Sequence, residues 1–279
     1  MTVSSFLNAV LVDEIGIESL RIEDCLLRSA YQPVFSRDGR RLQIRAMSAV
    51  TMVERQGRLA PLSDDVTRGF HSTAPEELIG LCQQLHLSNH RNLAMPDCDL
   101  FIAHQLANSG QLTSALHLAA DRARDAGEVP LEAKQVVCRI DMHDAVSASR
   151  RRVALEALSR DGFRVAFDVF DGAAETNGFR PDISEISSVW LAKIASETAA
   201  ARLLAPLMEA HRREGVGVMV SGIATSDDLR LAVTTGADYL AGDYLAPAEL
   251  VGSYVEEEPK DLRDLLPAGI GLMSKSGRR

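Results

Sequence analysis

The chain has 279 residues, of which 46% are hydrophobic, and a formal net charge of −9. This composition excludes a disordered chain, and the length suits one large α/β barrel. The acidic balance excludes nucleic acid and anionic membranes as partners, and no apolar run approaches the roughly 20 residues that cross a bilayer. The N-terminus lacks a basic segment and carries Asp13 and Glu14, so we expect no signal peptide and a cytoplasmic location.

The four cysteines share no zinc-like spacing; they are Cys25, Cys82, Cys98 and Cys138. Cys138 lies in an apolar strand pattern and Cys25 in a helical one. We therefore expect buried, reduced thiols and no disulfide.

Short apolar runs alternate with longer amphipathic segments along the chain. The residues up to about Arg28 read as a helix packed outside the main domain. Eight runs then predict strands, at 30–35, 42–50, 100–104, 136–141, 163–169, 187–192, 215–222 and 237–242. The last six are nearly continuous in apolar residues, which is typical of parallel strands covered on both faces.

Helical patterns lie between these runs, at 143–162, at 196–214 and from Thr225 or Ser226 onward. The first two strands are different, because only the segment SRDGRR separates them. Its Asp38-Gly39 pair is a hairpin turn signal, so these two strands are expected to be antiparallel.

The pattern predicts an α/β fold, a (β/α)8 TIM-like barrel with an antiparallel first strand and an extra N-terminal helix. We expect a helical segment packed on the barrel at 1–28 and the barrel itself at 29–258. Residues 259–279 are expected to form a C-terminal helix and a tail with a disordered end. No linker divides the chain.

Functional side chains of such barrels gather at the C-terminal ends of the strands. The predicted ends carry Arg45, His104, Arg139, Asp141, His143, Asp168, Asp171, Lys193, Ser221 and Asp243. The acids and histidines could hold a divalent ion. However, Arg45 and Arg139 would repel a cation if they faced inward. We therefore predict no metal site.

Five short motifs follow one another in an order and spacing similar to those of EAL domains, the cyclic di-GMP phosphodiesterase family. They are YQPVF at 31–35, IRAMSAV at 44–50, FDVFDG at 167–172, VSGIAT at 220–225 and TTGADYLAGDYLAPAEL at 234–250. The resemblance covers roughly residues 20–255. It implies a barrel with an inverted first strand and, for active members, hydrolysis assisted by two divalent cations.

The resemblance also implies that the chain has lost most of the family's site. The glutamate of the EAL signature falls on Arg45, and the arginine that follows it and contacts a substrate phosphate falls on Ala49. The strand-three asparagine falls on Ala103 or His104. The glutamate of the fourth strand falls on Arg139.

The second half of the barrel departs in the same way. In the motif that resembles DDFG, Asp168 is kept, Val169 replaces the second aspartate and Asp171 replaces the glycine. The lysine of KID falls on Ala192 or Lys193. Ser221 and Ala224 replace the two glutamates of EGVE, and Ala241 replaces the glutamine of QGY. Since a two-metal site acts as a unit, these losses predict a catalytically inactive domain.

Two interpretations are open for Asp168 and Asp171. They form a relocated metal or acid–base pair, or Asp168 is the salt-bridge partner of an inward arginine, Arg45 or Arg139, which replaces the lost cations. We take the salt bridge as the working hypothesis. Similarly, His143 and Asp144 read as the start of a helix rather than as metal ligands.

Four positions are candidates for ligand binding. Gln32 and Pro33 lie where the family touches its substrate, although Pro33 also suits a strand end. Gly222 and Gly242 follow strands seven and eight, where barrels often bind phosphate, although glycine also serves plain turns. The single His104 reads as a hydrogen-bonded structural residue rather than as a ligand.

The leading hypothesis is a catalytically inactive EAL-like domain without a cofactor, which acts in bacterial signalling by binding a regulatory protein. A homodimer is a further expectation, although the family's dimer-associated loop, here 172–187, departs from the usual sequence. One alternative is a metal-independent cyclic di-GMP receptor, which the acids Asp171 and Asp243 disfavour. The other is an active phosphodiesterase or another hydrolase with a rearranged site at Asp141, Asp168, Asp171 and His104.

Overall fold

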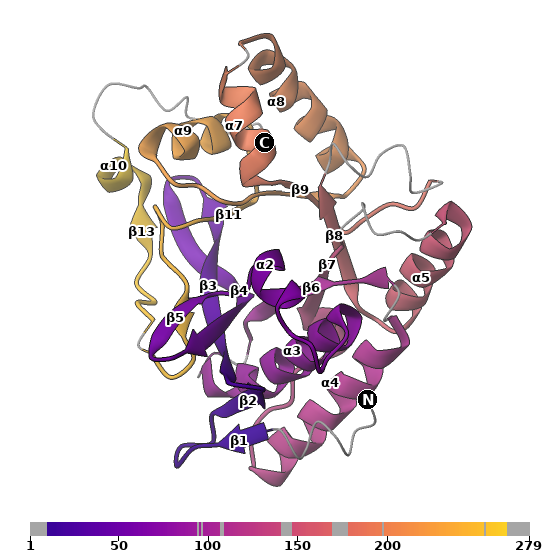
Figure 1. The fold of residues 1–279 in the computed structure, drawn as a ribbon. Coiled ribbons are helices and arrows are strands. Elements are labelled where there is room, and N and C mark those ends of the chain that lie inside the picture. The colour runs from indigo at the N-terminus through magenta and orange to yellow at the C-terminus, as the bar shows by residue number, and fades with distance from the viewer. Residues whose placement is uncertain are drawn as a thin grey trace.

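A computed structural model describes residues 10–266, apart from 94, 96, 107–108, 141–146, 169–177, 197 and 254. Eight strands close into a barrel (Figure 1). In order around the ring they are β3 (Cys25–Asp38), β11 (Tyr239–Ala241), β10 (Gly217–Val220), β9 (Ile183–Ile186), β8 (Arg164–Asp168), β7 (Val136–Ile140), β6 (Asp99–His104) and β4 (Arg41–Arg55).

Strand β3 runs against both of its neighbours in the ring, β11 and β4, whereas the other neighbouring pairs are parallel. The tight turn between β3 and β4 consists of Gly39 and Arg40, directly after the paired Asp38, and Gly39 has a φ of 59°. The predicted TIM-like barrel with an antiparallel first strand is therefore confirmed.

Helices pack on the outside of the ring. They are α2 (Asp64–Arg68), α3 (Pro75–Asn89), α4 (Ser109–Asp125), α5 (Ala148–Arg160), α7 (Ser188–Ser196), α8 (Thr198–Arg213), α9 (Ser226–Thr234) and α10 (Leu262–Leu265), with 3-10 turns η1 (His90–Leu93) and η3 (Ala133–Gln135). Leu116 of α4 and Leu155 of α5 share one core cluster with Cys138 of β7. Leu204 of α8 and Val218 of β10 belong to a second cluster on the other half of the ring.

The start of α9 shows how the sequence fixes a helix end. The Thr225 hydroxyl accepts a hydrogen bond from the Asp228 amide at 3.1 Å, and the Asp228 carboxylate accepts one from the Thr225 amide at 2.9 Å. This reciprocal capping satisfies two amides that a helix start leaves without partners. The predicted start at Thr225 or Ser226 is thus confirmed.

The predicted N-terminal helix is wrong over the described residues. They form β1 (Val10–Val12), β2 (Glu18–Ile22) and the beginning of β3. In β2 and at the beginning of β3, every second residue is buried, as expected for a strand. Leu20 and Ile22 of β2 and Cys25 and Leu27 of β3 are buried against α3, whereas the residues between them are not. Together with β5 (Arg58–Pro61), these strands extend the β3–β4 hairpin into an antiparallel sheet beside the barrel.

The strand predicted at 187–192 is also wrong, because this segment lies in α7. The sixth strand of the barrel is the preceding β9, with the sequence ISEI. At the C-terminus, β12 (Glu249–Leu250) pairs with β3 and β13 (Lys260–Asp261) pairs with β4. The predicted C-terminal helix corresponds to the short α10, and the predicted disordered end lies outside the described residues.

All four cysteines are free and buried, as predicted. Burial raises the pKa of Cys82 to about 11 and that of Cys98 to about 12, so both thiols stay protonated near neutral pH. No helix within the described ranges has the length and apolarity needed to cross a bilayer.

Gly242 ends β11 at a point where two backbones touch. It has a φ of 150°, and a Cβ at this position would lie 2.2 Å from the Ile223 amide nitrogen. We therefore expect Gly242→Ala to lower the free energy of unfolding by about 1–3 kcal/mol, since the close approach has no room for a methyl group. Urea denaturation measures this loss. The control is Gly39→Ala, which adds a methyl group at a positive φ where no atom lies within 4 Å; an equal loss in both variants would contradict the steric explanation.

Candidate active site

One residue from each barrel strand fills the centre of the ring. This layer consists of Val34, Ala46, Phe101, Val137, Ala166, Ile183, Met219 and Ala241, which form one buried cluster. Side chains alternate between the two faces of a strand, so the residue two positions further toward the mouth of the barrel also faces inward. This second layer consists of Gln32, Ser48, Ala103, Arg139, Asp168, Glu185, Ser221 and Asp243.

An ion pair between Arg139 and Glu185 occupies the second layer. The guanidinium binds both carboxylate oxygens, with an Nε to Oε2 distance of 2.9 Å, and Glu185 is 4% exposed. The Ser221 hydroxyl donates to the same carboxylate, and Arg139 donates to Ser48 at 3.5 Å. Glu185 above all, and Asp168 to a lesser degree, raise the pKa of Arg139 above its ordinary value. The charge of the arginine is thus balanced across the barrel.

Asp168 lies at the end of β8 on the inward face, as predicted. Its Oδ2 accepts a hydrogen bond from the Ser187 amide at 3.2 Å. The bidentate ion pair of Arg139 is made with Glu185 instead. The prediction of an inward arginine opposite Asp168 is therefore confirmed for Arg139 in its placement, but its main partner is a residue that the sequence did not reveal.

Gln32 faces the mouth from β3, the inverted strand. Its amide donates to Asp243 at 2.8 Å and to the Ala246 carbonyl at 3.2 Å. Pro33, the next residue, faces the other way and is buried outside the ring. Of the two predicted ligand-binding residues in this dipeptide, Gln32 alone lies at the mouth.

Arg45 does not face Asp168, so this part of the prediction is wrong. The pairing of β3 with β4 passes from Val34–Ala46 to Phe35–Ile44, which makes Arg45 the extra residue of a β-bulge. Its side chain is exposed and lies near Cys98, at the opposite end of β6 from the mouth. Ala49 points into the outer core, and the inward residue of this segment is Ser48.

The end of β6 separates the two candidates for the strand-three position. Ala103 lies on the inward face and is exposed at the mouth, whereas His104 is buried outside the ring. His104 Nδ1 lies 3.0 Å from the Gln83 amide of α3, and burial lowers its pKa to about 4. The contact of Nδ1 with Gln83 agrees with the interpretation of His104 as a structural residue.

The remaining predicted positions spread over several places. Ser221 lies in the second layer, and Ala241 lies in the buried layer below it. Ala224 is exposed, and its amide caps α9 through Asp228. Lys193 lies on α7, with its amine 4.1 Å from the centre of the Trp190 ring, and Ala192 is its exposed neighbour. Val169, Asp171, Asp141, His143 and Asp144 lie outside the described residues.

The two glycines differ in their surroundings. A Cβ on Gly242 would meet the Ile223 backbone, and the Ile223 amide already donates to the Ala241 carbonyl at 3.1 Å. A Cβ on Gly222 would lie 2.4 Å from that of Ser188. Close packing of neighbouring loops therefore explains both glycines without a phosphate.

The second layer does not fit two divalent cations. Arg139 places a positive charge at its centre, and both oxygens of Glu185 are bound to that arginine. Ser48 and Ala103 offer no carboxylate or amide oxygen from their side chains. In the part of the chain that the structure describes, no group of three or more His, Cys, Asp or Glu side chains could hold a metal ion.

The sequence model of the EAL domain family matches residues 18–248, so the chain belongs to this family. The solved structures with this fold include the Bacillus subtilis YkuI protein, which has an EAL domain and is in complex with substrate c-di-GMP and calcium. It has a TM-score of 0.63 and 16% identity, and the match covers 82% of this chain and 56% of that one.

Two further structures are similar. An EAL domain protein from Listeria monocytogenes EGD-e has a TM-score of 0.60 and 12% identity over 81% of this chain and 89% of that one. Klebsiella pneumoniae BlrP1 with FMN and cyclic diGMP and no metal ions has a TM-score of 0.58 and 14% identity over 84% of this chain and 54% of that one. This chain thus spans less than two thirds of YkuI and of BlrP1. No curated protein matches the sequence.

Proposed function

We propose that this chain is an EAL domain that does not hydrolyse cyclic di-GMP and that acts in the cytoplasm as a regulatory protein by binding another protein. The observation that carries the proposal is the ion pair of Arg139 with Glu185. An arginine stands at the position where the family resemblance calls for a glutamate, and its charge is neutralised by a carboxylate that would otherwise be available to a metal.

Two charge reversals, at Arg139 and Glu185, support the proposal more strongly than the loss of one metal ligand would. The resemblance placed the lysine position at Ala192 or Lys193, which lie on α7. We take it to be Glu185 instead, because the barrel strand at this place is β9 and Glu185 is its inward residue. With this placement, Arg139 stands for a glutamate and Glu185 for a lysine, and the two replaced residues form an ion pair across the barrel. This arrangement supports a site selected to hold the fold together rather than to bind cations.

We expect no turnover of cyclic di-GMP above the level without protein in Mg²⁺ or Mn²⁺, because the second layer lacks the ligands for two ions. Chromatography of the nucleotide products measures the reaction, with an active EAL protein as the positive control. Turnover that disappears in Asp168→Ala would overturn the proposal and favour a hydrolase with a rearranged site.

A metal-independent receptor for cyclic di-GMP is the second candidate. Gln32 at the mouth and the solvent-exposed Ala103 favour it. A BlrP1 structure also holds cyclic diGMP with no metal ions. Asp168 and Asp243 oppose it by repelling phosphates. Titration with cyclic di-GMP in EDTA separates the candidates: micromolar binding that Gln32→Ala weakens would establish the receptor.

A further inference from the structure

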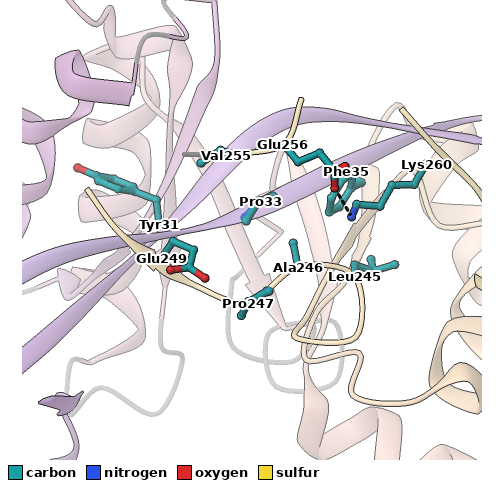
Figure 2. Close-up of a pocket in the computed structure, with 10 residues that line it drawn as sticks. All are labelled: Tyr31, Pro33, Phe35, Leu245, Ala246, Pro247, Glu249, Val255, Glu256 and Lys260. Atoms are coloured by element: carbon teal, nitrogen blue, oxygen red, sulfur yellow. Dashed lines mark hydrogen bonds and ion pairs between the residues drawn. The ribbon is translucent and has the colours of Figure 1, made fainter. Parts of the chain in front are cut away.

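A cavity lies on the outer face of β3 (Figure 2), on the opposite side of the strand from Gln32. Its volume is about 190 Å³. The outward residues of β3 form one wall, and the chain after β11 and before β13 forms the other. The lining residues are Tyr31, Pro33, Phe35, Leu245, Ala246, Pro247, Glu249, Val255, Glu256 and Lys260.

The cavity exists because the partners of β3 leave a gap. β11 pairs with β3 as far as Val34, and β12 resumes the pairing at Tyr31. Pro33 lies in this gap, where a residue without an amide N–H leaves no donor unsatisfied. The Tyr31 hydroxyl donates to the His86 carbonyl at 2.7 Å, which holds this part of β3 against α3. The cavity is therefore part of the fold and does not need a ligand to form.

The size of the cavity limits what it can accept. Sites for drug-sized ligands have volumes of about 300–1,000 Å³, whereas a cavity of about 150 Å³ holds a benzene ring. The walls are mainly apolar, with Pro33 and Ala246 near the centre and with Phe35 and Leu245 toward Lys260 (Figure 2). One aliphatic or aromatic side chain fits these dimensions better than a nucleotide does.

The rim of the cavity is acidic. Glu249 lies at one end and Glu256 at the other, and the exposed Glu257 and Glu258 continue the same segment. Within the described ranges, an ion pair involves Glu256 alone of these four, with Lys260 at 3.4 Å. In a chain with a net charge of −9, this rim attracts cationic groups.

We infer that this cavity docks a segment of a partner protein that inserts one apolar side chain and places a Lys or Arg beside it, against Glu249. The apolar anchor supplies buried area, and the basic neighbour supplies charge complementarity at the rim. The site is separated from the barrel mouth by β3. The inference therefore goes beyond the proposed loss of catalysis, and it stands whether or not cyclic di-GMP is hydrolysed.

The test is selection of random heptapeptides displayed on phage against the whole chain, with Ala246→Leu as the counter-target. Ala246 lines the cavity between Pro33 and Leu245 (Figure 2), so a larger side chain there fills it. We expect enrichment of peptides with an apolar residue flanked by Lys or Arg. The affinity of a labelled enriched peptide, measured by fluorescence anisotropy, is expected to fall at least tenfold in Ala246→Leu and about fivefold in Glu249→Lys.

The control is Glu214→Lys, which makes the same charge reversal at an exposed glutamate after α8 and is expected to bind the peptide like the unchanged chain. Thermal melting shows that each variant is folded. Enrichment of acidic peptides, or equal selection by Ala246→Leu, would overturn the inference. A self-association that Ala246→Leu abolishes would show instead that a second copy of this chain fills the cavity.

Discussion

Arg139→Ala is expected to lower the free energy of unfolding by about 3 kcal/mol, because it leaves the buried carboxylate of Glu185 without its counter-charge. The value lies at the low end of the range for broken buried pairs, since 36% of the Arg139 side chain is exposed and water can approach the site. Urea denaturation monitored by circular dichroism measures the loss. The second variant, Arg139→Met with Glu185→Leu, is expected to recover most of it, since removal of both charges leaves none uncompensated.

The matched control is Arg152→Ala, which breaks an exposed pair with Glu156 within α5. Exposed pairs of this kind contribute about 0.3–0.5 kcal/mol. A loss in Arg139→Ala no larger than that of the control would show that the pair across the barrel adds nothing to stability. The proposed role of the reversed charges would then be wrong.

Stability is expected to fall steeply between pH 6.5 and pH 4. Burial lowers the pKa values of His86, His90 and His104 to about 4 in the folded chain, against about 6.5 when unfolded. In this window the unfolded chain binds protons that the folded chain does not. The stability that these three histidines contribute is therefore complete above pH 6.5. It is lost as the pH falls from 6.5 to the folded values of about 4, by at most about 4 kcal/mol per pH unit for the three together.

Urea denaturation at a series of pH values measures this slope. His86 lies between the hydroxyls of Ser29 and Thr51, each at 2.9 Å. Its replacement in His86→Gln is expected to reduce the slope by about a third. His117→Gln, at an exposed position of α4, is the control and is expected to keep the original slope. Identical slopes in all three proteins would contradict the assignment to buried histidines.

The barrel could be predicted because its signal is repeated. Continuous apolar runs of similar length recur along the chain, and a short turn with Gly39 inverts the first strand. The errors occur where a sequence fits both the two-residue period of a strand and the 3.6-residue period of a helix. The segment ESLRI-ED-CLL alternates like a hairpin, yet its leucines also suit a helix, and only packing on α3 decides between them.

The candidate site is harder to predict, and two local features explain why. A β-bulge at Arg45 has no sequence signal of its own, and it shifts which residues of β4 face the mouth. Glu185 escapes prediction because a charged residue in so short a strand is typical of a loop, and the more apolar segment after it imitates the strand. The alternation in ISEI, followed by serines that suit a helix start, is the signal that could have found it.

Because side chains alternate along β3, two adjacent residues lie on opposite faces of the strand. Gln32 faces the mouth of the barrel, whereas Pro33 lines the cavity on the outer face of the strand. The two residues of one sequence motif therefore contribute to two different parts of the fold. A chain can lose the chemistry of the barrel mouth and still need Pro33 on the other face of the strand. A retained motif is therefore no proof of a retained activity.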